Sequence, residues 1–193
     1  MIVSTEYEAK ALNIDPDAIG ARILAAGGQH VADRFMRRHV YDIPGYPTRW
    51  IGLGETGTET TLYVTQLLSD ASGEVREVEL EVTDPEAARA FLDMLGFTPK
   101  AYQENLRSSW LLGTARLEIH SWPLISPYLK IEADSAQEVR EAAERLGISS
   151  GDLTAENTSA VYARYGYDLA TIPCLRFPGA RTSPEDLAHV PAP

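Results

Sequence analysis

Glu6-Tyr7-Glu8-Ala9-Lys10 is the stretch that decides the fold, because it alternates charged and uncharged side chains near the start of the sequence. Successive side chains of a β-strand point to opposite faces, so Glu6, Glu8 and Lys10 share one face of a predicted strand. Two carboxylates and an ammonium on one face would be costly in a dry core. This face is therefore either solvated on the outside of the protein or lines a space that holds water, a metal or a polyanion.

The same alternation recurs further along the chain. Glutamates alternate with aliphatic residues over 77–82, charged residues alternate with aliphatic ones over 116–120, and Lys130 and Glu132 flank Ile131. A barrel with an apolar inside and a charged outside would give this pattern, and so would a charged tunnel whose apolar outer face packs under helices. We expect the tunnel, because the amphipathic helices of the chain need an apolar surface to bury against.

The order of elements predicts an α+β fold. Strand patterns span 2–12, 30–43, 49–54, 59–68, 74–82, 100–112, 115–121 and 127–133. Helices are expected after the Asp15-Pro16 and Asp84-Pro85 start signals, after the capping pattern at Ser135, and over 154–165. Eight antiparallel strands favour a closed barrel, which leaves no unpaired edge, with the helices flanking it.

Composition narrows the classes of partner. The 193 residues carry a formal net charge of −11, which disfavours nucleic acid and an acidic membrane surface as partners. No apolar run approaches the roughly 20 residues of a membrane span, and no signal-peptide core opens the sequence. A cytoplasmic protein is expected, with one domain over 1–181 and a mobile, proline-rich tail over 182–193. The expected partner is a small-molecule ligand, and a homodimer is left open.

Several motifs in order resemble the CYTH-domain superfamily, which includes class IV adenylyl cyclases, thiamine triphosphatases and other triphosphate tunnel enzymes. The matching segments are Glu6-x-Glu8-x-Lys10, Met36-Arg37-Arg38-His39-Val40-Tyr41-Asp42, Glu77-Val78-Glu79-Leu80-Glu81-Val82, Tyr102-Gln103-Glu104-Asn105 with Arg107, and the run 156–166. The resemblance implies an eight-stranded antiparallel tunnel. In it, basic side chains would grip a triphosphate and acidic side chains would hold divalent cations.

The chain departs from the family pattern at both kinds of position. Where the family has two arginines and a lysine facing the tunnel, this sequence has Gly52, Gly54 and Thr65. Where the family has acidic residues on the last two strands, it has Arg116, His120 and Lys130. Losing three charge-assisted hydrogen bonds would cost on the order of 4–9 kcal/mol of triphosphate binding. Two interpretations are compatible with this pattern: the opposite charges that remain pair with one another, or the pocket serves a new ligand.

The candidate site residues follow from the alternation and the resemblance together. The predicted catalytic residues are Glu6, Glu8, Lys10, Glu118, His120 and Lys130. The predicted substrate-binding residues are Arg37, Arg38, Tyr63, Glu79, Glu81, Arg107 and Arg116, and any surviving metal site would use Glu6, Glu8 and Glu132. Gly52 and Gly54 are expected to open volume beside Tyr63, and His120 is expected to titrate near neutral pH beside Glu118.

Three functions are compatible with these residues. The main hypothesis is a divergent tunnel protein that binds and transforms a small organic ligand by acid–base chemistry and needs no cofactor. The first alternative is a class IV adenylyl cyclase or a triphosphatase, acting with Mg²⁺ or Mn²⁺ on ATP or another triphosphate. The second alternative is a binding protein without catalysis.

Overall fold

The computed structural model describes residues 2–69 and 74–179. Eight long strands make up most of it: β1 (Ile2–Ala11), β2 (Gln29–Asp42), β3 (Arg49–Glu55), β4 (Thr60–Ser69), β5 (Glu74–Glu81), β6 (Ala101–Leu112), β7 (Ala115–Ser121) and β8 (Tyr128–Ala133). The two-residue strands β9 (Leu153–Thr154) and β10 (Cys174–Leu175) pair with β1 and β6. The helices are α1 (Pro16–Ala25), α2 (Pro85–Met94), α3 (Ala136–Arg145) and α4 (Thr158–Arg164).

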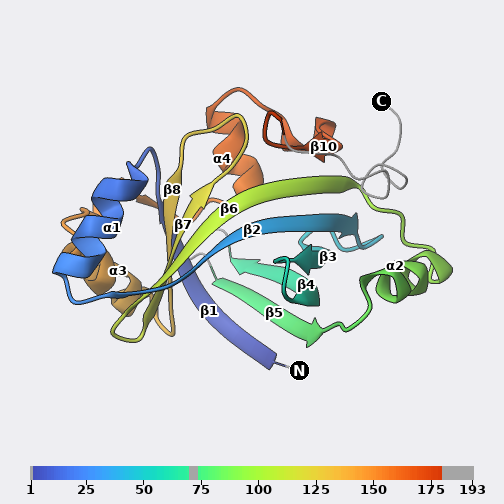
Figure 1. Ribbon diagram of the computed structural model, residues 1–193, viewed down its shortest axis with the longest axis horizontal. Coiled ribbons are helices and arrows are strands. Elements are labelled where there is room, and N and C mark those ends of the chain that lie inside the picture. The colour runs from blue at the N-terminus through green and yellow to red at the C-terminus, as the bar shows by residue number, and fades with distance from the viewer. Residues whose placement is uncertain (1, 70–73, 180–193) are drawn as a thin grey trace.

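The eight long strands form a closed circuit of antiparallel pairs. Their order is β6-β2-β3-β4-β5-β1-β8-β7, and β7 pairs again with β6. Figure 1 shows the strands curling around a common interior, with α1 and α3 at one end and α2 at the other. The predicted α+β fold with an eight-stranded antiparallel barrel and flanking helices is therefore confirmed.

The largest apolar cluster lies outside the barrel wall, between the strands and two helices. Ile23 of α1 and Ala143 of α3 pack there with Leu117 of β7 and with Leu129 and Ile131 of β8, all fully buried. These strand residues alternate with the charged ones, so the apolar face of each strand points away from the barrel interior. The alternative of an apolar interior is wrong for these strands.

Two smaller clusters cover other parts of the wall. Leu92 of α2 packs against Tyr41 of β2 and against Ile51 and Leu53 of β3. Tyr162 of α4 belongs to a cluster with aromatic residues at the β7–β8 connection, beside which α4 lies in Figure 1. The three longer helices begin where the sequence predicts, because Asp15, Asp84 and Ser135 each accept a hydrogen bond from a backbone N–H of the first turn.

The fourth helix is shorter than predicted. Thr154 pairs with Lys10 in a strand, and the helix begins only after Asn157, whose side chain caps it. Sequence periodicity also missed β10 and its parallel pairing with β6. The tail over 182–193 lies outside the described residues, so its predicted mobility and the single domain over 1–181 stay predictions. In the described part of the chain, no helix is long and apolar enough to span a membrane.

Truncating Ile131 tests whether the apolar face of β8 forms the core. Ile131 is fully buried under α3, so Ile131→Ala is expected to lower the free energy of unfolding by about 2–5 kcal/mol. Leu106→Ala on β6 is the control, because Leu106 is 47% exposed, and it should change stability by less than about 1 kcal/mol. Urea unfolding measures the stability of both variants. Equal losses of unfolding free energy would contradict a core on the outer face of β8.

Candidate functional site

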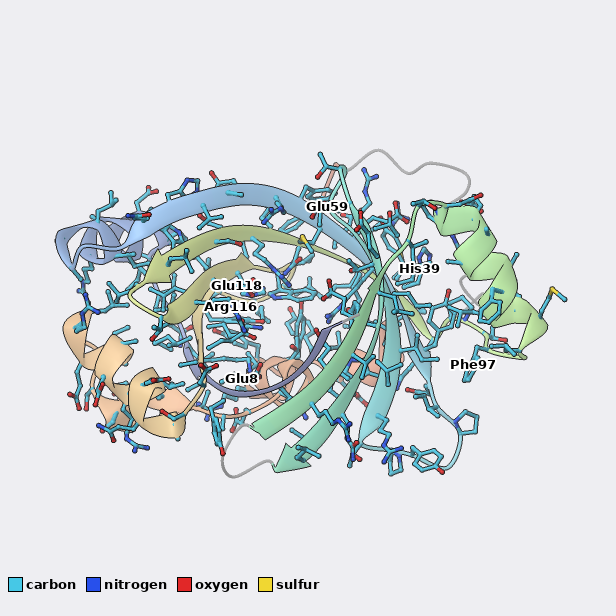
Figure 2. The ribbon with its side chains drawn as sticks, turned by 90° about the horizontal axis from the view of Figure 1, so that it is seen from below. Glu8, His39, Glu59, Phe97, Arg116 and Glu118 are labelled. Carbon is cyan, nitrogen blue, oxygen red and sulfur yellow. The ribbon has the colours of Figure 1, made fainter. Side chains whose placement is uncertain are left out.

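The polar faces of the strands enclose one large cavity of about 630 Å³. Every long strand contributes to its lining, and Ala155 and residues 157–159 and 169–170 line it beside α4. Figure 2 shows Glu8, Arg116 and Glu118 directed into the interior of the curled sheet. The charged tunnel predicted from strand alternation is therefore present. It holds most of the residues that the sequence singles out, although their roles stay predictions.

Lys130 lies among three carboxylates from three adjacent strands. Its Nζ is 2.6 Å from Glu132 Oε1, 3.4 Å from Glu118 Oε2 and 3.8 Å from Glu8 Oε2. Each of these side chains keeps only 12–17% of its surface exposed. Burial lowers the pKa of Lys130, but the three carboxylates outweigh burial and hold that pKa well above its usual value. Lys130 is therefore a permanently charged ammonium.

Three more cations complete this ionic network. Lys10 donates to Glu8 Oε1 at 2.5 Å, Arg107 donates to Glu118 Oε1 at 3.0 Å, and Arg116 lies 3.8 Å from Glu132. Burial raises the pKa of Glu8, and Lys130 and Lys10 more than offset this, so that the pKa lies below its usual value. The same balance, with Lys130 and Arg107 as the cations, holds the pKa of Glu118 well below its usual value.

His120 is enclosed and hydrogen-bonded through both ring nitrogens. The Asn105 amide nitrogen lies 2.9 Å from Nδ1 and can only donate, so Nε2 carries the proton and donates to Glu118 at 3.0 Å. The imidazole is 3% exposed and stacks on Tyr128 and Trp122, with centroids 5.1 and 6.3 Å away. The predicted Glu118–His120 contact is confirmed.

The expectation that His120 titrates near neutral pH is wrong. Burial lowers its pKa to about 4, because desolvation penalises the imidazolium. The positive charges of Arg107 and Lys130 act in the same direction, and the hydrogen bond to Glu118 only partly opposes them. His120 is therefore neutral at physiological pH and acts as a hydrogen-bonding group rather than a cation.

Tyr63 occupies the space that Gly52 leaves. A Cβ atom built on Gly52 would overlap the Tyr63 ring, whereas one on Gly54 would meet ring carbon Cε1 at 3.4 Å. The ring thus lies against the backbone of β3, on the cavity side. The expectation that Gly52 opens free volume is wrong, because the absent side chain accommodates an aromatic wall instead.

Glu77 is a further acidic residue of the cavity that the sequence analysis did not select. Thr65 Oγ1 donates to Glu77 Oε2 at 2.6 Å. Burial raises the pKa of Glu77, and this hydrogen bond only partly opposes the rise. Glu77 therefore takes up a proton more readily than an ordinary glutamate does. Its place in the alternating run 77–82 was a signal that could have identified it.

The end of the cavity beside α4 is aromatic. Arg38 Nε donates to Gln103 Oε1 at 2.9 Å, and its guanidinium lies 5.0 Å from the centroid of Trp122. Trp122 Nε1 donates to the hydroxyl of Tyr128. Of these residues the sequence analysis selected only Arg38. Alternation could have placed Gln103 and Asn105 on the same face as Arg107, and Tyr128 on the same face as Lys130.

The remaining predicted site residues differ in where they lie relative to the cavity. Glu79 lines the cavity, whereas Glu81 is exposed at the end of β5 and is not part of the lining. Arg37 adjoins the cavity, but its own side chain is exposed and its guanidinium lies 5.3 Å over the ring of Phe35. Adjacent strand residues point to opposite faces, which separates Arg37 from Arg38. The side chain of Glu6 lies outside the described part of the structure, so its predicted role is not tested.

A divalent cation does not fit among the described carboxylates. The position between Glu8, Glu118 and Glu132 is taken by the Lys130 ammonium, and Lys10, Arg107 and Arg116 bring the network to four positive and three negative charges. Among the residues that the structure describes, no set of three or more histidine, cysteine, aspartate or glutamate side chains is placed to hold a metal ion.

Comparison with solved structures supports this fold. The chain is similar to the PH1012 protein of Pyrococcus horikoshii, with a TM-score of 0.70 and 20% identity over 79% of this chain and 96% of the other. It is also similar to a proposed adenylate cyclase of Vibrio parahaemolyticus, with a TM-score of 0.72 and 13% identity over 83% and 98% of the two chains.

A third similar structure is a proposed adenylyl cyclase of Hippeastrum that is described as having a dominant triphosphatase activity. Its TM-score is 0.57, with 14% identity over 84% of this chain and 95% of the other. No protein-family model matches the sequence, and the curated proteins give no significant match. At these identities the similarity shows the fold alone, which is the antiparallel tunnel that the motifs predicted.

The lowered pKa of His120 makes stability depend on pH. The unfolded imidazole takes up a proton below about pH 6.5, whereas the folded one stays neutral until about pH 4, so stability is lost as pH falls between these values. Between pH 7 and 5 the loss attributable to His120 should be about 2 kcal/mol. Denaturant unfolding of the His120→Gln variant should not show this loss of stability. A variant at the exposed His30, His30→Gln, should still show it. If the free energy of unfolding falls equally with pH in the unaltered protein and in His120→Gln, the loss does not come from His120.

The contact between Gly52 and Tyr63 predicts a difference between two glycines of one strand. Gly52→Ala should displace the Tyr63 ring and cost about 1–3 kcal/mol of stability, whereas Gly54→Ala makes only ordinary contacts and should be nearly neutral. Urea unfolding measures both variants. Combining Gly52→Ala with Tyr63→Ala should remove the cost, and an undiminished cost in the Tyr63→Ala background would refute the contact as its cause.

Proposed function

We propose that this chain binds a small organic anion in its cavity without a divalent cation and exchanges a proton with it. The observation that carries the proposal is the internal pairing of the charged cavity residues. Four cations of the network are held by Glu8, Glu118 and Glu132, so these carboxylates are engaged with the protein's own ammonium and guanidinium groups. A ligand therefore meets a site whose central charges are already compensated.

The cations without a carboxylate partner suggest the ligand's charge. Within the described lining, Arg38 and Arg49 have no carboxylate within 4.0 Å; Arg38 lies over Trp122, and Arg49 lies 4.7 Å over Tyr46. Alternation along β3 puts Arg49 on the same face as the buried Ile51 and Leu53, which is the outer face of the wall. Arg38 is therefore the guanidinium that faces a ligand, and it favours one with one or two negative charges, such as a carboxylate or a monophosphate. A triphosphate carries more charge than Arg38 neutralises, and it would have to displace carboxylates from Lys130 or Arg107.

Glu77 is the group best suited to exchange the proton. It lines the same cavity, and its pKa is raised by burial, whereas the pKa values of Glu8 and Glu118 are lowered by their cations. Thr65 fixes one carboxyl oxygen through its hydroxyl. Tyr63 provides an aromatic surface between this wall and the backbone of Gly52. His120 holds Glu118 in place by hydrogen bonding and is not the titrating group in this proposal.

A second candidate function is triphosphate turnover, as in the first alternative derived from the sequence. It is favoured by the fold shared with a protein described as having triphosphatase activity, and by Lys10, Arg38 and Arg107 on the cavity wall. It requires the phosphates to break the existing ion pairs. A third candidate is binding without catalysis, which needs only the anion site.

Adjacent arginines of β2 provide a matched test of the anion site. Arg38→Met should lose a compound that co-purifies with the protein, because a hydrogen bond to a charged group contributes about 1.5–3 kcal/mol, or roughly 10- to 150-fold in affinity. Arg37→Met should retain it, since that guanidinium lies over Phe35. Native mass spectrometry of both variants, with and without EDTA, identifies the compound and tests its independence from metal.

Turnover assays distinguish the candidates. ATP, thiamine triphosphate and tripolyphosphate are each incubated with Mg²⁺ or Mn²⁺, and products are resolved by mass spectrometry. No product above a Glu8→Gln control is expected. Saturable, metal-dependent release of phosphate or a cyclic nucleotide would instead establish the second candidate. An anion that leaves the denatured protein chemically unchanged, with no product formed on incubation, would favour binding alone.

A further inference from the structure

Glu8, Glu118 and Glu132 form a set of oxygen donors on three neighbouring strands, which we name the carboxylate trio. Glu8 of β1 lies directly opposite Glu132 of β8, and Glu118 of β7 lies directly opposite Lys130 of β8. Like charges placed opposite each other across a strand pair are destabilising, so the trio requires a cation between its members. Lys130 supplies that cation at 2.6–3.8 Å from all three.

We propose that the Lys130 ammonium is the resident cation of the carboxylate trio, and that it takes the place where a divalent cation would otherwise bind. The trio alone offers the hard oxygen ligands that Mg²⁺ and Mn²⁺ prefer. With the ammonium among these oxygens, a divalent ion would meet a like charge at its binding position. The native protein therefore excludes divalent cations from the trio, and the identity of residue 130 decides which cation the cavity holds.

The neighbouring cations strengthen this exclusion. Lys10 holds the second oxygen of Glu8, Arg107 holds the second oxygen of Glu118, and Arg116 approaches the second oxygen of Glu132. Both oxygens of each carboxylate therefore face positive charge. The inference depends only on this geometry, so it does not rest on the identity of the anion in the proposed function.

Replacing the ammonium by a carboxylate should create a divalent-cation site. Lys130→Glu removes the resident cation and adds a fourth carboxylate, so it should bind Mn²⁺ at least about tenfold more tightly than the unaltered protein, or about 1.4 kcal/mol. Mn²⁺ binding is measured by electron paramagnetic resonance of the free ion. Lys100→Glu is the matched control: it makes the same charge change on the cavity wall, but Lys100 pairs with Asp42 at 2.9 Å and makes no contact with the trio.

A second variant identifies the ligands of the new site. Lys130→Glu combined with Glu118→Gln removes one member of the trio and should return Mn²⁺ affinity towards that of the unaltered protein. If Lys130→Glu does not fold without metal, circular dichroism follows its refolding as Mn²⁺ is added. Recovery of the folded signal would support the site, and a variant that neither binds Mn²⁺ nor folds with it would overturn the inference.

The outcomes separate this inference from the proposed function. Mn²⁺ binding by the unaltered protein as tight as by Lys130→Glu would overturn the resident-cation role and also the metal independence of the proposed function. Equal gains in Lys130→Glu and Lys100→Glu would show a general charge effect and would overturn the inference alone. A failure to find an anion on the protein would count against the proposed function and leave the Mn²⁺ result unaffected.

Discussion

The pairing of Lys130 with three carboxylates is the interaction on which the rest of the cavity depends. A partly buried charge is costly unless it is paired, and removing one member of a buried ion pair typically costs about 3–5 kcal/mol because its partner stays behind. Here each carboxylate is also shared with a second cation, Lys10, Arg107 or Arg116. The low pKa values of Glu8 and Glu118 follow from this arrangement of charge, whereas the neutral state of His120 follows mainly from its burial.

A charged interior is possible only because the hydrophobic core lies elsewhere. The aliphatic residues of β7 and β8 are buried beneath α1 and α3, and those of β2 and β3 pack with α2, so the apolar clusters surround the barrel. Closure of the barrel through the β6–β7 pairing leaves the long strands paired on both sides. The wall is therefore stabilised from outside, which allows cavity residues to change without loss of the core.

Strand alternation predicted this architecture well, because a period of two is a property of the local sequence. It placed Glu8, Lys10, Glu118, Lys130 and Glu132 on the inner face, where the structure has them. Properties that arise from three-dimensional neighbours were not predictable in this way. The pKa of His120 depends on its complete burial, and the role of Gly52 depends on the direction of the Tyr63 ring from the next strand. Likewise, Trp122 reaches Arg38 only through the folded barrel.

The same reasoning explains why fold similarity alone does not assign the chemistry of this chain. Proteins with 13–20% identity share the tunnel, and that level of identity leaves the cavity charges free to differ. In this chain Lys130 places a positive charge at the point where three carboxylates meet. A metal ion supplies two positive charges that leave with it, whereas an ammonium supplies one that is covalently attached. If Lys130 is the resident cation, as proposed, the cavity has a fixed charge that does not depend on the metal concentration.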